Sequence, residues 1–142
     1  MSARFFPDDM PAPAVSRETL PWWQAAAEHR LVVQECRACR RRQLPPGPIC
    51  RRCRSFDLGW CQVPGTGAVY TYTIVHRAMI PSLAARLPYV VIVVELDDGG
   101  GARLASNLVE ADPSRVRVGM RVEVVWEDMG PTLAVPRFRP LT

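Results

Sequence analysis

The sequence Cys36-Arg-Ala-Cys39-Arg-Arg-Arg-Gln-Leu-Pro-Pro-Gly-Pro-Ile-Cys50-Arg-Arg-Cys53 decides the fold of the first half of this chain. It contains two Cys-x-x-Cys pairs that are separated by ten residues. One such turn brings two sulfur atoms within reach of a single ion, and a second turn completes a tetrahedral thiolate site for zinc. We therefore predict a zinc ribbon in which Cys36, Cys39, Cys50 and Cys53 bind the metal. Four protein ligands leave no open coordination position, so we expect the ion to be structural.

The bulk composition predicts a cytoplasmic protein that does not enter a membrane. The chain has 142 residues, enough for one domain or two small modules. Its longest unbroken apolar run, Tyr89 to Val94, is too short to cross a bilayer. The N-terminus lacks the charged and apolar regions of a secretion signal. In a reducing compartment, paired cysteines are metal ligands more often than disulfides.

Positive charge is concentrated in the predicted ribbon. The formal net charge is +4, and four thiolates with one zinc ion would lower it to about +2. Two interpretations are open. The arginines offset a negative zinc–thiolate centre, which we favour, or they bind phosphates of nucleic acid or of a nucleotide-bearing cofactor. The arginines concerned are Arg37, Arg40, Arg41, Arg42, Arg51, Arg52 and Arg54.

The composition divides the chain into three parts. Residues 1–17 are rich in proline without periodicity, and we predict an arm that is extended or partly disordered. The break Pro64-Gly-Thr-Gly67 marks the boundary between a helix-plus-zinc-ribbon module, residues 18–64, and an OB-fold domain, residues 65–142.

A short helix is expected to begin near Pro21, because proline is tolerated in the first helical turn. Leu20, Trp23 and Ala27 recur at helical spacing and would form its packed face, with Trp22 off the centre. Two adjacent tryptophans point about 100° apart on a helix. We expect one of Trp22 and Trp23 to anchor a partner protein, with packing on the ribbon as the equal alternative.

Five segments of the last part are rich in residues that favour strands, namely 68–77, 89–97, 102–109, 120–127 and 132–138. Five strands with a long first connection suit a small Greek-key barrel of the OB type. An immunoglobulin-like sandwich would need more strands. The predicted fold is mainly β, with a short N-terminal helix, a rubredoxin-like zinc ribbon and a five-stranded OB-fold barrel.

Several further segments occur in a familiar order. They are Leu31-Val-Val-Gln-Glu-Cys36, Pro45-Pro-Gly-Pro48, Gly67-Ala-Val-Tyr-Thr-Tyr-Thr-Ile-Val-His76-Arg77, Pro88-Tyr-Val-Val91, Glu95-Leu-Asp97, Asn107-Leu-Val109, Val118-Gly-Met-Arg-Val122 and Pro136-Arg-Phe138. Together with the cysteine pairs they resemble the zinc-ribbon plus OB-fold family that accompanies thiolase-like enzymes in acyl-CoA metabolism. The resemblance covers residue 16 to the end.

The resemblance implies an accessory subunit in a hetero-oligomer. Members of that family accompany thiolases, synthases, acyltransferases or aldolases of the thiolase fold. They bridge subunits, help bind or channel the acyl-CoA, and leave the catalytic residues to the partner. This sequence departs from the family at Arg40 and Arg54, where glycine usually follows the second cysteine of each pair. That position takes a left-handed backbone, which costs a non-glycine residue about 1 kcal/mol or more.

The first strand of the barrel is expected to end in a candidate binding site. His76 and Arg77 stand at its end, and a guanidinium there suits a phosphate of acyl-CoA. The alternative is that His76 has no binding role and only forms local hydrogen bonds at the end of the strand. The loop 78–88 is too apolar for a plain solvent loop, so Met79 and Ile80 are predicted to cover the barrel or to contact a partner.

Two other functions compete with the accessory role. Zinc ribbons and OB barrels also serve in nucleic-acid binding, for which Tyr70 and Tyr72 are the available stacking residues. This sequence favours that function less, because the later strands carry valine and acidic residues instead. An independent enzyme acting through Cys61 and His76 is the weakest hypothesis, and Cys61 is predicted to be a core residue.

Overall fold

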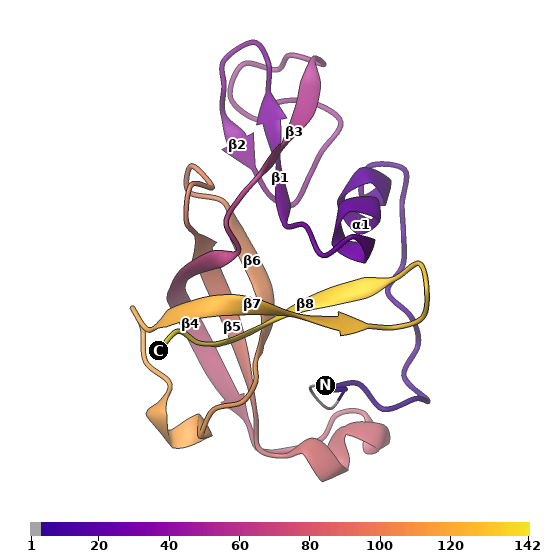
Figure 1. Ribbon diagram of the computed structural model, residues 1–142, viewed down its shortest axis with the longest axis vertical. Coiled ribbons are helices and arrows are strands. Elements are labelled where there is room, and N and C mark those ends of the chain that lie inside the picture. The colour runs from indigo at the N-terminus through magenta and orange to yellow at the C-terminus, as the bar shows by residue number, and fades with distance from the viewer. Residues whose placement is uncertain (1–3) are drawn as a thin grey trace.

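The computed structural model describes residues 4–142 as a small ribbon sheet above a closed β-barrel, with one helix beside the ribbon's base (Figure 1). The ribbon has the strand order β2-β1-β3, formed by β1 (Val32–Cys36), β2 (Arg42–Gln43) and β3 (Leu58–Gln62). Both of its strand pairs are antiparallel. The helix α1 (Leu20–Ala27) leads directly into this sheet.

The barrel confirms the predicted OB-type fold. Its strands close in the order β4-β5-β6-β8-β7, and only β6 and β8 run parallel. They are β4 (Thr66–Val75), β5 (Tyr89–Leu96), β6 (Arg103–Leu108), β7 (Arg121–Asp128) and β8 (Ala134–Pro140). Each end lies within two residues of its predicted position. Two 3-10 helices, η1 (Pro81–Arg86) and η2 (Pro113–Arg115), fill the longer connections.

Two local features of β4 allow the barrel to close. The register between β4 and β5 shifts between Val69 and Thr71, and such a bulge bends a strand. Near its start β4 crosses β5 so closely that a Cβ on Gly67 would lie 2.4 Å from the carbonyl oxygen of Glu95. Only glycine fits at that crossing.

One hydrophobic core joins the helix, the base of the ribbon and the barrel. Its largest fully buried hydrophobic side chains include Phe138, Ile92, Val33, Val69, Val94 and Val122. Within residues 4–142, neither α1 nor the two short 3-10 helices has the length and apolarity that crossing a bilayer requires.

The packed face of α1 differs from the predicted one. Trp22, Ala25 and Ala26 are buried, whereas Leu20 is 45% exposed. The two alanines let the helix backbone come close to its neighbours β1 and β8. Almost every residue of this helix is apolar, so the spacing of Leu20, Trp23 and Ala27 could not fix which face turns inward.

The described part of the N-terminal arm has no helix or strand before α1, and it packs against the barrel. It runs along one side of the molecule from the end that carries η1 up to α1 (Figure 1). Arg86 on η1 donates a hydrogen bond to the carbonyl oxygen of Arg4 at 2.7 Å. The Phe5 ring packs edge-on against Tyr89, with 5.5 Å between ring centroids.

Candidate functional site

The four paired cysteines converge at the tip of the ribbon. Their sulfur atoms all lie within 4.8 Å of one another. The distances from Cys36 to Cys53 and from Cys39 to Cys50 are each 3.6 Å between sulfur atoms. In a tetrahedral zinc site with zinc–sulfur bonds of about 2.3 Å, neighbouring sulfurs are about 3.8 Å apart. The donor set and its spacing therefore fit a zinc ion.

The chain folds into two equivalent turns that aim these sulfurs inward. The N–H of Arg40 donates to the carbonyl oxygen of Cys36 at 2.9 Å, and the N–H of Arg54 donates to that of Cys50 at 2.9 Å. Both arginines have a positive φ, 67° for Arg40 and 63° for Arg54. The predicted left-handed backbone at the two usual glycine positions is confirmed.

Backbone amides also prepare the sulfurs to bind a cation. The N–H groups of Cys53 and Arg52 point at the Cys50 sulfur, at 3.5 Å and 3.4 Å. The bond from Cys53 lowers the pKa of the Cys50 thiol to about 6, against the opposing effect of burial. The N–H of Cys39 likewise lowers the pKa of Cys36. At Cys36 and Cys50 the ribbon thus favours the thiolate, the form that binds zinc. A hydrogen bond from the Ser55 backbone lowers the pKa of Cys53, but burial and the other three thiols outweigh it and raise that pKa to about 11.

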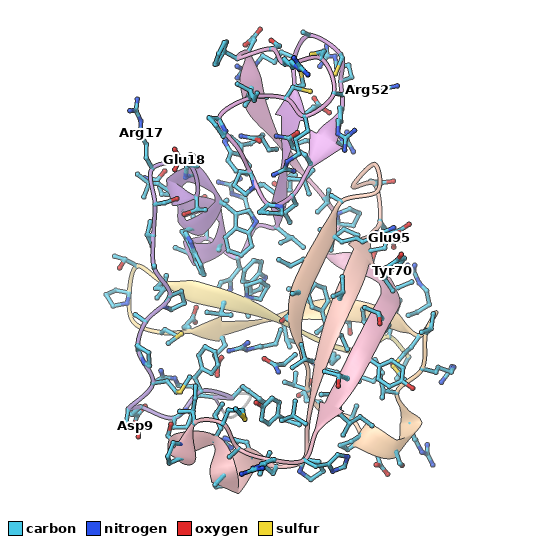
Figure 2. All side chains as sticks on the ribbon, turned by 180° about the vertical axis from the view of Figure 1, so that it is seen from behind. Asp9, Arg17, Glu18, Arg52, Tyr70 and Glu95 are labelled. Carbon is cyan, nitrogen blue, oxygen red and sulfur yellow. The ribbon has the colours of Figure 1, made fainter. Side chains whose placement is uncertain are left out.

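The arginines of the ribbon divide into two groups. Arg37 pairs with Asp57 at 3.1 Å, and Arg42 pairs with Glu35 at 2.9 Å. Arg41, Arg52 and Arg54 have no side-chain hydrogen bond or ion pair to any described residue, and Figure 2 shows Arg52 pointing away from the ribbon.

Arg42 links the ribbon to the barrel. Besides its ion pair with Glu35, its guanidinium donates to the carbonyl oxygen of Asp98 in the turn between β5 and β6. Packing reinforces this link, because a Cβ on Gly100 would meet the Arg42 side chain at 3.3 Å. These contacts help to hold the cysteine cluster in a defined place relative to the barrel.

The predicted acyl-CoA and partner residues lie at two opposite ends of the molecule. His76 and Arg77 follow β4 and are exposed, and Met79 beside them is 84% exposed. Ile80 is also exposed, whereas Leu83 on η1 is buried. In Figure 1 this end lies opposite the ribbon and α1. The fold therefore does not bring the tryptophans and the loop together.

The two tryptophans have different environments. Trp22 is only 8% exposed, so it is a core residue. This burial corrects the prediction that Trp22 could anchor a partner at the surface. Trp23 is half-buried and packs against Trp22 at right angles, with 4.8 Å between ring centroids. Among buried side-chain nitrogen and oxygen atoms of residues 4–142, Nε1 of Trp22 alone lacks a hydrogen-bond partner. Both rings border an apolar cleft between α1, the ribbon and the barrel.

A buried ion pair beneath the N-terminal arm is a feature that sequence reasoning missed. Arg137 donates to Glu127 and, through Nη1, to Oδ1 of Asn107 at 2.8 Å. The backbone amides of Phe5 and Phe6 donate to the other carboxylate oxygen of Glu127. Burial lowers the pKa of Arg137, although its bonds to Glu127 oppose that shift. The available signal was the presence of two arginines, Arg137 and Arg139, in the otherwise apolar sequence of β8.

Comparison with known proteins gives matches over most of the chain. Residues 23–59 match the rubredoxin-like zinc ribbon domain of ChsH2, and residues 60–127 match the C-terminal OB-fold domain of ChsH2. A chain of the solved Ltp2-ChsH2(DUF35) aldolase is 42% identical, with a TM-score of 0.81 over 91% of this chain and 98% of that chain.

Two curated relatives match most of this chain, but the chain covers different shares of their lengths. A probable enoyl-CoA hydratase alpha subunit of Thermomonospora curvata is 43% identical over 130 residues. That match covers 92% of this chain but only 40% of the relative, so the chain spans two fifths of its length. A DUF35 domain-containing scaffold protein of Methanocaldococcus jannaschii is 32% identical over 106 residues, which is 74% of this chain and 73% of that protein. The ordered ribbon, the barrel and these matches show that the chain belongs to the ChsH2 (DUF35) family of zinc-ribbon and OB-fold proteins.

Proposed function

We propose that this chain is a non-catalytic accessory subunit of a larger enzyme that processes acyl-CoA, and that its partner has the thiolase fold. In the complex it would bridge subunits and help to bind or channel the acyl-CoA. The observation that carries the proposal is the similarity to the Ltp2-ChsH2(DUF35) aldolase along 91% of the chain. The name of that structure joins a ChsH2(DUF35) component to a second component within one aldolase.

The names of the curated relatives support a role within an assembly. One is an alpha subunit of a probable enoyl-CoA hydratase, and the archaeal protein is named a scaffold. A scaffold acts through its surfaces, which agrees with the large apolar side chains that this chain exposes around Met79 and Ile80. We propose those two residues and Trp23 as contacts to the partner.

The surroundings of the histidines also favour an accessory role over an independent enzyme. Nε2 of His29 lies 2.7 Å from Oδ1 of Asp128, and its ring stacks on Trp126. His76 is exposed at the far end of β4. In the described part of the chain, Cys61 makes no contact with either histidine that would activate it as a nucleophile.

The metal would serve this role by holding the ribbon in shape. We propose that Cys36, Cys39, Cys50 and Cys53 bind one structural zinc ion in a reducing compartment, the cytoplasm. We further propose that His76 and Arg77 contact acyl-CoA, because an exposed guanidinium suits its phosphates.

Co-expression tests the accessory role. The full chain, tagged for purification, is expressed together with the products of its neighbouring genes, and a thiolase-like protein is expected to elute with it. Acyl-CoA turnover should require both chains. Elution of the tagged chain alone, beside a folded and active thiolase-like protein, would contradict the proposal.

Paired variants test the proposed contact surface. Met79→Asp with Ile80→Asp introduces charge at exposed positions and is expected to weaken the association by about tenfold or more, as charge does in an apolar contact. Val118→Asp, at another exposed apolar residue, is the matched control and should leave the complex intact.

Binding of single-stranded nucleic acid has less support. Arg103 covers the Tyr70 ring at 3.6 Å, so that ring is already engaged. Figure 2 shows Tyr70 beside Glu95, which pairs with Arg103 at 3.3 Å and places negative charge next to the ring. We expect no shift of single-stranded oligonucleotides at low salt.

A further inference from the structure

A cleft opens where the barrel closes between its two parallel strands. β6 and β8 are in register at a single pair, Leu108 with Phe138. On either side of that seam lie Leu104 and Val135, and the Ser106 hydroxyl reaches across it to the carbonyl oxygen of Pro136 at 2.6 Å. We call this space the seam cleft. It has a volume of about 400 Å³.

Three separate segments surround the seam cleft. Helix α1 contributes Trp22 and Trp23, the ribbon contributes Leu44 and Pro45, and the barrel contributes the two strands of the seam. Protein interiors rarely contain voids much larger than a water molecule. A cleft of this size lies instead within the range of about 300–1,000 Å³ that is usual for small-molecule sites.

The walls select an uncharged occupant. The guanidinium of Arg137 is already bound to Glu127 and Asn107, and the Ser106 hydroxyl is bound to Pro136. The other charged lining residue, Arg103, is partly exposed and pairs with Glu95. An anionic group would therefore find no free cation inside the cleft.

The walls also disfavour a peptide segment. Pro45, Pro46 and Pro136 line the cleft and have no backbone N–H to donate. A bound peptide would bury carbonyl groups that find no backbone N–H donor on these three residues, which costs free energy. An apolar ring or chain carries no such cost, and water gains little in a space with few polar partners.

We infer that the seam cleft binds the uncharged, apolar part of a small acyl ligand and leaves any charged group of that ligand outside the cleft. The identity of the ligand as an acyl group rests on the proposed function. The cleft and its chemistry do not, so binding can be measured on this chain alone.

Fluorescence titration of the full, zinc-loaded chain with the uncharged ketone dye prodan tests the inference. Saturable binding of one dye per chain, with emission shifted to the blue, is expected. Ala105→Phe is the test variant, because Ala105 lines the cleft but is exposed, so a larger side chain fills the space without entering the core. It should weaken binding by about tenfold or more, as lost apolar burial predicts. Thr73→Phe, at an exposed position on β4, is the matched control and should bind like the original chain.

The other outcomes are decisive as well. The absence of saturable binding, or equal binding by Ala105→Phe with an unchanged melting temperature, would overturn the inference. If the dye does not bind and Ala105→Phe instead releases the partner protein, the cleft holds a side chain of the partner. That result would overturn the ligand site and leave the accessory role standing.

Discussion

Arg137 and Glu127 form a buried ion pair beneath the N-terminal arm, in which Nε and Nη2 of the arginine lie 3.0 Å and 2.8 Å from one carboxylate oxygen. Both side chains are 6% exposed. They lie diagonally across β7 and β8, because Arg137 is opposite Val125 and Glu127 is opposite Val135. The Phe6 ring covers the guanidinium at 4.2 Å. The arm thus shields these two charges from solvent on the outer face of β7 and β8, whose other face packs into the barrel.

Removing one partner of this pair should destabilise the chain more than removing both. Glu127→Leu leaves the Arg137 charge buried without its carboxylate, which is expected to lower the free energy of unfolding by about 3–5 kcal/mol. Glu127→Leu combined with Arg137→Met should recover most of that loss. Urea unfolding measures both variants. Glu95→Gln, which breaks an exposed pair, is the control and should cost about 0–1 kcal/mol. A double variant less stable than Glu127→Leu would contradict this account.

Zinc content should depend on the paired cysteines and not on the fifth one. The purified chain is expected to contain one zinc ion, and Cys50→Ser should lose it because three thiolates no longer close the tetrahedron. Chelation should unfold the ribbon, since structural zinc contributes on the order of 10 kcal/mol in small ribbons. Elemental analysis and circular dichroism measure the two effects. Cys61→Ser, which removes the half-buried thiol on β3, is the control and should keep its zinc.

A glycine at position 54 should strengthen zinc binding. Arg54 has a φ of 63° and no side-chain hydrogen bond or ion pair to a described residue. Arg54→Gly removes the strain of about 1 kcal/mol, which corresponds to an increase of about fivefold in apparent zinc affinity. Competition with a chelator measures the affinity. Arg52→Gly is the control, because Arg52 is not among the residues with positive φ and should gain nothing. Equal gains in both variants would show that backbone strain is not the cause.

The fold was predictable where local pattern determines structure. The cysteine spacing fixes the ribbon, and alternation along β7 predicts that Val122 and Val124 face the core, which the structure confirms. The strand ends follow from turn residues such as those of the β5–β6 hairpin. These signals need only a few neighbouring residues.

The remaining features depend on contacts between distant segments. The alternating pattern of β7 places Glu127 on the face that is expected to meet solvent. It is buried only because Phe5 and Phe6 lie over it. The seam cleft needs α1, the ribbon and the barrel at once. No pattern within one segment could predict either feature.

Stability at low pH should depend on Asp97, which ties three strands together. Its carboxylate accepts hydrogen bonds from Arg121, at 3.0 Å for one of them, and from the Thr66 hydroxyl at 2.6 Å. Arg121, with help from Thr66, lowers the pKa of Asp97 to about 2. An unfolded aspartate has a pKa of about 3.9, so the unfolded chain takes up the proton first as the pH falls. The stabilisation is therefore complete above about pH 4 and is lost between about pH 4 and 2.

Asp97→Asn should remove this pH-dependent term. Because the carboxylate is partly exposed, its contribution is expected to be about 1 kcal/mol near neutral pH. Urea unfolding at pH 7 and pH 3 measures the difference, which should shrink at the lower pH. Asp9→Asn, at an exposed carboxylate of the arm, is the control and should show no such change. An equal loss at both pH values would indicate a purely structural effect.

Because Nε1 of Trp22 has no hydrogen-bond partner within residues 4–142, we expect two substitutions of this residue to differ strongly in their effect on stability. Trp22→Ala should lower the free energy of unfolding by about 3–5 kcal/mol, because it empties a core position. Trp22→Phe keeps an aromatic ring and removes a buried donor without a partner, so it should cost less than about 1 kcal/mol. Urea unfolding of the isolated chain measures both. A loss in Trp22→Phe as large as that in Trp22→Ala would show that the indole N–H has an acceptor in the folded chain. If the partner protein or a ligand supplies that acceptor, Trp22→Phe should weaken the complex while leaving the isolated chain stable.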